Sequence, residues 1–254
     1  CCFKWNIKTQ KYIICMVSKS QIKFVCQLAQ KKQRDKANLF VAEGHKSIHE
    51  FSKASYEMHH LYVVDPNLFL GKEFQTVSVE EMRSMSALKT PPDSLAVFSK
   101  PIMCEISTSS VIVALENIQD PGNLGTMIRL CDWFGLSQLI CSTKTVDCYN
   151  SKVVQASMGS ISRVNITYLD FKDLFSDKKL NAVAADLDGH PLNEFKFQKN
   201  QIVIFGNESM GISDEIKSMV KDRVTIPRYN SNLDVESINV ANSVAIVLAE
   251  LKNG

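Results

Sequence analysis

The residues best suited to chemistry lie in three polar stretches, each of which follows an apolar segment. They occupy residues 117–129, 205–211 and 226–239 of the 254-residue sequence. Amide, carboxylate and guanidinium groups at such places can bind a polar ligand, hold a phosphate or move a proton. In open α/β folds, ligands bind beyond the carboxyl ends of parallel strands. The three stretches are therefore candidates for one shared pocket.

The first stretch belongs to the segment VIVALENIQDPGNLGTMIRLCDWFG, residues 111–135. Its apolar start predicts a buried strand, its centre a turn rich in Asn, Asp, Pro and Gly, and its end a helix. The polar residues include Asn117, Asp120, Asn123 and Arg129. A strand that delivers such residues to a helix N-terminus is a common place for ligand binding.

Each stretch also has a simpler, purely structural interpretation. Gly206 and Gly211 can close turns that need a positive φ. The Asp-Pro-Gly sequence at 120–122 is common in turns, and Ser237 can be a helix N-cap. Arg129 can be a surface cation. Each residue taken singly favours the structural interpretation, whereas three polar strand ends together weaken it.

Two common nucleotide-binding signatures are absent. No GxGxxG sequence follows a predicted strand, and no GxxxxGK[ST] sequence occurs. These absences argue against a dinucleotide-binding oxidoreductase and against a P-loop NTPase.

Alternating elements must position the polar stretches. Residues 16–100 predict a small α/β domain with a helix over 20–32, capped by Ser18 or Ser20, and a capping box of Ser78 and Glu81 that opens a helix through Leu88. Further elements of this half are strands at 38–44, 60–65 and 94–100 and a helix at 45–54, in which Ile48 and Phe51 face inward. Residues 101–110 resemble a linker.

The second half alternates again, which predicts a mostly parallel sheet. Strands are expected at 111–115, 139–141, 163–169, 181–187, 202–208 and 223–227, with a helix around 151–158. Residues 237–252 carry apolar side chains three and four apart, which predicts a long amphipathic helix. Its apolar stripe suits either the core of one chain or contact with a second chain.

The cations of residues 31–36 allow two interpretations. The sequence KKQRDK contains four cations and one acid. The simpler interpretation is a solvated helix end, and the functional one is a patch that contacts phosphates.

Composition limits the function classes further. A hydrophobic content of 45% and a charged content of 22% are ordinary for a globular protein, and the net charge of +2 restricts any basic surface to local patches. No apolar run approaches the roughly 20 residues of a membrane-spanning helix. The five cysteines beyond residue 15 form no CxxC pair and have no His at ligand spacing, so we expect no metal site and a reducing cytoplasm.

The first fifteen residues, CCFKWNIKTQKYIIC, lack the features of a signal peptide. Met16 resembles a natural start. We therefore expect residues 1–15 to be a non-native or disordered leader, residues 16–105 a small domain, and residues 106–254 a second domain.

The three stretches together resemble the SpoU/TrmH family of RNA ribose methyltransferases, within the SPOUT superfamily. The family's first motif, N-x-x-D-P-x-N-x-G-x-x-x-R, is met in full over residues 117–129. Its second, G-x-E-x-x-G, is met by Gly206, Glu208 and Gly211. Its third is met by Ile226-Pro227 and by residues 237–240, with Ile238 in place of the usual Leu and a longer intervening loop. The first half also resembles the family's small substrate-binding domain.

The resemblance implies a fold, a reaction and a set of site residues. The second domain would be a trefoil-knotted parallel-sheet domain that binds S-adenosylmethionine (SAM) and methylates a ribose 2′-hydroxyl in tRNA or rRNA. Arg129 would act at the reacting centre with Asn117, while Glu208 and Asn239 help to build the catalytic site. The expected cofactor-binding residues are Leu187, Gly206, Gly211, Ile226, Ser237 and Ile238.

The resemblance also implies partners. RNA contacts are expected from Lys31, Lys32, Arg34 and Lys36 of the small domain and from Asn123. The protein would form a homodimer through the knotted region and its last helix. The alternative is a non-catalytic RNA-binding protein on the same fold, against which the intact Asn117 and Arg129 argue.

Overall fold

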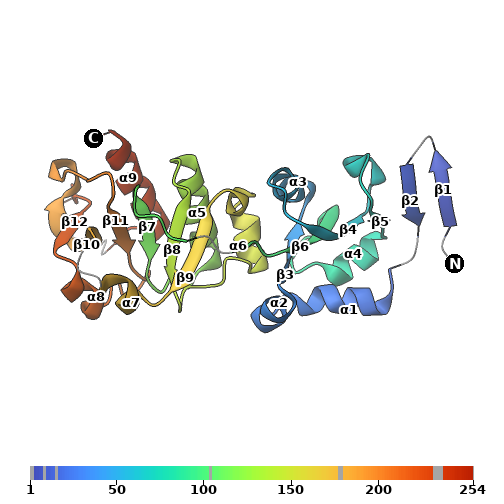
Figure 1. Ribbon diagram of the computed structural model, residues 1–254, viewed down its shortest axis with the longest axis horizontal. Coiled ribbons are helices and arrows are strands. Elements are labelled where there is room, and N and C mark those ends of the chain that lie inside the picture. Colours follow the sequence, from blue (N-terminus) through green and yellow to red (C-terminus); the bar gives the residue numbers. More distant parts are fainter. Residues whose placement is uncertain are drawn as a thin grey trace. The chain divides into compact units, whose positions relative to one another are not determined.

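The computed structural model describes residues 3–7, 10–14, 17–102, 105–176, 180–230 and 237–253. Two compact units make up the chain: Cys1–Ile102 with Tyr149–Ser162, and Met103–Cys148 with Arg163–Gly254 (Figure 1). Each contains a six-stranded sheet. The segment Tyr149–Ser162 thus groups with the first unit although it lies in the second half of the sequence, which sequence patterns alone did not indicate.

The sheet of the first unit has the order β1-β2-β5-β4-β6-β3. Its strands are β1 (Phe3–Ile7), β2 (Gln10–Ile14), β3 (Leu39–Glu43), β4 (Met58–Val63), β5 (Gln75–Thr76) and β6 (Ser94–Ser99). Its helices are α1 (Lys19–Gln27), α2 (Lys31–Ala37), α3 (His45–Lys53), α4 (Val79–Met85) and α6 (Ser151–Ala156), with 3₁₀ turns η1 (Pro66–Phe69) and η2 (Ser160–Ser162). β6 lies between β4 and β3 and pairs antiparallel with both, and its first five residues are buried.

Local signals account for several elements of this unit. The predicted capping box of Ser78 and Glu81 is confirmed at the start of α4, and Ile48 and Phe51 are fully buried on α3. Ser18 caps α1. The antiparallel pair of β1 and β2 lies within residues 1–15, for which the sequence patterns predict a leader and not strands.

The predicted single helix over 20–32 is wrong, because the chain forms two shorter helices instead. α1 ends at Gln27 and α2 begins at Lys31. Arg34 explains the break: its Nη1 donates to the carbonyl oxygens of Leu28 at 2.8 Å and of Ala29 at 2.7 Å. A cation that satisfies the last carbonyls ends a helix favourably.

The second unit contains a parallel sheet, as predicted. Its strands are β7 (Ile112–Leu115), β8 (Gln138–Ser142), β9 (Asn165–Leu169), β10 (Ala182–Pro191), β11 (Ile202–Phe205) and β12 (Asp222–Thr225), in the order β12-β10-β11-β7-β8-β9. Its helices are α5 (Pro121–Trp133), α7 (Phe171–Ser176), α8 (Asp214–Met219) and α9 (Val240–Asn253), with the 3₁₀ turn η3 (Leu192–Glu194). Every residue of β7 and β11 is buried, as expected for central parallel strands.

The strand order places two of the polar stretches side by side. From β7 the sheet continues through β8 to β9 in one direction, and β11 then pairs with β7 on its other side. Leu115 and Phe205, the last residues of β7 and β11, are register partners. Such a reversal of strand order is a topological switch point, where open α/β sheets bind ligands.

The last helix packs within its own unit. α9 contacts α5 (Figure 1), and its buried residues are Ala241, Val244, Val247 and Leu248. The predicted amphipathic helix is confirmed, although it begins at Val240 rather than at Ser237. Among the described residues, no helix combines the length and apolar character that crossing a membrane requires.

Candidate active site at the switch point

The turn between β7 and α5 has a fixed geometry. Asn117 has a φ of 56°, in the left-handed region that Asn tolerates better than most residues. Its backbone N–H donates to Ser142 Oγ at 2.8 Å, and that hydroxyl donates to Asn117 Oδ1 at 3.0 Å. Asp120 caps α5 by accepting from the Asn123 N–H at 2.7 Å. The turn from Asn117 to Asp120 is therefore held at both ends.

The loop after β11 folds back tightly on itself. Asn207 and Gly211 exchange two backbone hydrogen bonds, of 3.0 and 2.9 Å. A Cβ on Gly206 would lie 2.1 Å from the carbonyl carbon of Gly211 and 2.2 Å from the nitrogen of Ile212. Gly211 has a φ of +66°. Gly211 thus has the positive φ predicted for it, whereas Gly206 does not and is instead required by the close packing of the loop.

Glu208 joins the stretches. Its carboxylate accepts from Asn123 Nδ2 at 3.0 Å, from Asn207 Nδ2 at 3.3 Å, and from the backbone N–H groups of residues 119 and 120 at 3.5 and 3.4 Å. Asn123 Oδ1 in turn accepts from Asn239 Nδ2 at 3.0 Å. One chain of hydrogen bonds therefore links all three polar stretches, which confirms that they converge.

Two further residues fix this geometry and were missing from the predicted site. Glu116 is 6% exposed and accepts from the Ser213 N–H at 2.9 Å and from the Ser213 hydroxyl at 2.6 Å. Asn207 Nδ2 donates to the Asn117 carbonyl at 2.7 Å. Their positions in the sequence could have identified them as site residues. Glu116 is a charged residue at the end of an apolar run, and Asn207 lies between Gly206 and Glu208.

A cavity of about 590 Å³ opens beside this network. The apolar side chains of Phe205, Val224 and Val247 line it, and so does Glu208. All six predicted cofactor-binding residues line it too: Leu187, Gly206, Gly211, Ile226, Ser237 and Ile238. Its volume lies within the ~300–1,000 Å³ that is usual for pockets of small organic ligands.

A partly buried ion pair lies in the wall of the same cavity. Lys217 Nζ is 2.7 Å from Asp186 Oδ2, and the two side chains are 23% and 13% exposed. Asp186 Oδ1 also accepts from the Leu187 N–H at 2.8 Å. Paired charges and apolar walls together suit a ligand that has both polar and apolar parts.

Residues 110–249 match the model of the SpoU rRNA methylase family. The chain belongs to this family. Residues 19–96 match the model of an MRM3-like substrate binding domain. The family accounts for the motifs at the three strand ends and for the α/β domain that precedes the parallel sheet.

Relatives and solved structures agree with this assignment. The chain is 27% identical over 235 residues to the Bacillus subtilis 23S rRNA (guanosine(2553)-2′-O)-methyltransferase RlmP, covering 89% of this chain and 93% of that protein. A Porphyromonas gingivalis protein of the TrmH family of RNA methyltransferases is 33% identical with a TM-score of 0.83, over 94% and 100% of the two chains. An AdoMet-bound rRNA methyltransferase from Sinorhizobium meliloti, 24% identical, shares the fold with a TM-score of 0.83 over 94% and 98%.

Arg129, the predicted residue at the reacting centre, does not line the cavity. It lies on the exposed face of α5, six residues beyond Asn123, or about 9 Å along the helix axis. Within the described part of the chain it has no hydrogen-bond or ion-pair partner. Asn117, Asn123 and Asn239 also lie outside the lining. Asn123 and Asn239 are linked to it through Glu208, and Asn117 through Asn207. The role of Arg129 stays a prediction.

The predicted RNA-binding cations separate into two kinds. Lys31, Lys32 and Lys36 are exposed on α2. Arg34 is 2% exposed and holds the end of α1, so the expectation that it contacts RNA is wrong. The spacing of cations in a sequence does not reveal which of them turns inward to satisfy carbonyl groups.

No group of three or more His, Cys, Asp or Glu side chains that could hold a metal ion occurs among the described residues. The cysteines among the described residues are Cys26, Cys131, Cys141 and Cys148, all with free thiols. Burial raises the pKa of the Cys131 thiol to about 12, so this group behaves as a small apolar side chain.

Proposed function

We propose that this protein transfers a methyl group from SAM to a ribose 2′-hydroxyl in RNA, either rRNA or tRNA. The observation that carries the proposal is the hydrogen-bond chain from Asn239 through Asn123 to Glu208, which ties the three family motifs to the edge of one cavity. The relatives named as RNA 2′-O-methyltransferases support the reaction class.

The cavity fits the cofactor that this reaction needs. Gly206 lines the cavity and packs directly against the backbone of Gly211, where a Cβ would collide, so this loop can close tightly beside a cofactor. The backbone around Gly206, Ile226 and Ile238 would hold the adenosine part, with Leu187 at the pocket wall. When bound, SAM supplies an activated methyl group on its sulfonium, so the protein must provide alignment and an outlet for one proton.

Arg129 and Asn117 are proposed to act on the RNA. A guanidinium carries only donors, so Arg129 would grip a phosphate and polarise the 2′-hydroxyl rather than accept its proton directly. Its freedom from partners in the described chain leaves it available for this contact. Asn117 would hold the turn and the substrate in register through its bonds to Ser142.

The proposal includes a homodimer that pairs through the exposed face of α5 that carries Arg129. Trp133 is 83% exposed and lies four residues beyond Arg129, hence on the same side of the helix. Ile246 of α9, the helix that packs against α5, is 41% exposed. Pairing through these helices would cover both apolar side chains and bring Arg129 to the subunit interface, where it would complete a site.

Two expectations from the family accompany this proposal. The parallel-sheet domain would contain a trefoil knot, consistent with the insertion of β11 between β7 and β10. The protein would work in a reducing cytoplasm, consistent with the free thiols of its described cysteines.

The test measures cofactor binding and methyl transfer separately. Calorimetry with SAM, followed by transfer of labelled methyl groups to purified rRNA and tRNA, should show binding and ribose 2′-O-methylation. Binding of RNA without binding of SAM would instead favour the non-catalytic RNA-binding protein. Absence of both would contradict the proposal.

The Arg129→Ala variant tests the reacting centre. We expect turnover to fall about 100-fold or more, as for loss of a positioned charge at a transition state, with the Kd for SAM unchanged. Lys252→Ala, which removes an exposed cation near the end of α9, is the matched control and should keep full activity. Unchanged turnover in Arg129→Ala would remove Arg129 from the mechanism.

A further inference from the structure

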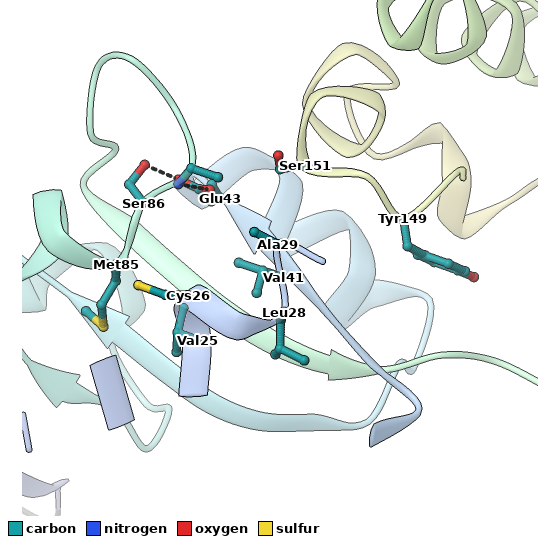
Figure 2. Close-up of a pocket in the computed structure, with 11 residues that line it drawn as sticks. Val25, Cys26, Leu28, Ala29, Val41, Glu43, Met85, Ser86, Tyr149 and Ser151 are labelled. Atoms are coloured by element: carbon teal, nitrogen blue, oxygen red, sulfur yellow. Dashed lines mark hydrogen bonds between the residues drawn. The ribbon is translucent and has the colours of Figure 1, made fainter. Parts of the chain in front are cut away.

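A second, smaller cavity lies within the first unit. Its volume is about 130 Å³, and residues of α1, β3, the segment after α4 and the start of α6 line it (Figure 2). Val25, Leu28, Val41 and Met85 give it apolar walls. Most residues that line this cavity lie within residues 19–96, which match a substrate binding domain.

One carboxylate lines this apolar cavity. Glu43, the last residue of β3, is 9% exposed. Its Oε2 accepts from the Ser86 hydroxyl at 2.5 Å, and its Oε1 accepts from the Ala87 N–H at 3.1 Å (Figure 2). An ionised carboxylate offers about four acceptor sites, so these two bonds leave roughly one on each oxygen.

Those features define the ligand chemically. A cavity of about 130 Å³ is slightly smaller than the ~150 Å³ cavity that admits a benzene ring, so it suits one six-membered ring and neither a whole purine nor a nucleotide. A buried carboxylate excludes phosphate by charge. The group that fits has apolar faces and two adjacent N–H donors on one edge.

We propose that this cavity receives the six-membered ring of an unpaired guanine of the substrate RNA, with the N1–H and N2–H groups donating to the two oxygens of Glu43 and the five-membered ring and ribose remaining outside. Guanine is the standard base with two N–H donors on adjacent ring-edge positions, and RNA-binding proteins commonly read unstacked bases by this edge. The inference rests on the proposed function, because it takes the substrate to be RNA.

Two neighbouring features support a base at this place. α2 packs against β3 and carries the exposed Lys31, Lys32 and Lys36, which suit the phosphates on either side of an inserted base. Burial raises the pKa of Glu43 and the donors Ser86 and Ala87 oppose that rise. Binding is therefore measured over a series of pH values, and it should strengthen as the pH rises and the carboxylate ionises.

The experiment uses the full chain and four uridine heptamers whose central nucleotide is guanosine, inosine, adenosine or uridine. Inosine differs from guanosine by loss of the N2 amino group alone. We expect fluorescence anisotropy to show about tenfold tighter binding of the guanosine oligomer than of the inosine oligomer, and weaker binding still of the other two. Equal Kd values for the four oligomers would overturn the inference without any variant.

Two variants separate base reading from a structural role of Glu43. Glu43→Gln replaces one oxygen by a donor, so the preference for guanosine over inosine should disappear. Ser86→Ala removes a bond that holds Glu43 but keeps the carboxylate, so the variant should keep at least a threefold preference even if its Tm falls. A preference that survives in Glu43→Gln, or is lost equally in both folded variants, would show that the carboxylate does not read the base.

Methyl transfer to rRNA and SAM calorimetry, run on the same samples, distinguish this inference from the proposed function. Wild-type transfer without a guanosine preference would refute the guanine site alone. A guanosine preference without any SAM binding would refute the methyltransferase and leave the guanine site standing.

Discussion

Replacement of Gly206 by alanine is the sharpest test of the cofactor cavity. The added Cβ would lie 2.1 Å from the Gly211 carbonyl carbon and 2.2 Å from the Ile212 nitrogen. Real Cβ contacts essentially never fall below 3.0 Å, so the loop must open by about 1 Å. Backbone atoms are the obstacle, and rotation of a side chain cannot relieve it.

The expected cost follows from the size of this collision. Forcing one extra carbon into a packed place costs about 1–3 kcal/mol. If the cofactor requires the closed loop, binding must recover that geometry, and the same energy raises the Kd for SAM about five- to 150-fold. Calorimetry with SAM and a thermal unfolding curve, measured on one preparation, give the two quantities.

Gly211→Ala is the matched control within the same loop. Its Cβ would meet nothing within 4 Å, but the φ of +66° is strained for alanine, at about 1–2 kcal/mol. We expect Gly211→Ala to lower stability with a smaller change in the Kd for SAM than Gly206→Ala. A wild-type Kd and Tm in Gly206→Ala would refute the argument that close packing of this loop shapes the cofactor site.

Two further predictions concern groups away from the cavity lining. Glu116→Gln leaves Ser213 with one acceptor oxygen in place of two. The free energy of unfolding, measured in urea, should therefore fall by about 1–3 kcal/mol. An unchanged value would mean that the two bonds between Glu116 and Ser213 do not stabilise the fold. The hydrogen bond from Lys100 lowers the pKa of Asp35, so the stabilisation by this pair is present above the ordinary carboxyl pKa of about 4 and is lost as the pH falls through the lowered value. Lys100→Met should therefore cost up to about 1 kcal/mol at pH 7, given the exposure of Asp35, and progressively less below pH 4; a difference that is constant with pH would contradict the assignment.

The local parts of the fold and site were predictable from the sequence because local patterns determine them. The apolar run before Glu116 forms β7, Asp120 caps α5, and the capping box of Ser78 opens α4. Each depends on residues within a few positions of one another. The polar strand ends could therefore be recognised before their contacts were known.

Features that depend on distant contacts could not be predicted in the same way. The pairing of β11 with β7 joins segments about 90 residues apart, and no periodicity contains that information. Arg34 was misassigned because burial of a guanidinium against the carbonyls of Leu28 and Ala29 depends on where α1 ends. The motifs alone do not show that Glu208 contacts Asn123. That contact could be expected only from the general rule that ligands bind beyond the carboxyl ends of parallel strands.

The contacts of Glu208 also refine its proposed role. Oε1 accepts from Asn123 and residue 120, and Oε2 accepts from residue 119 and Asn207, which fills the roughly four acceptor sites of a carboxylate. Asn123 must turn its NH₂ group toward Glu208, which leaves its oxygen for Asn239, whose own oxygen accepts from the Ala241 N–H at 2.9 Å. None of these groups can take a substrate proton without breaking an existing bond. We therefore propose that Glu208, Asn123 and Asn239 act as positioning residues and that the proton of the 2′-hydroxyl leaves by another route.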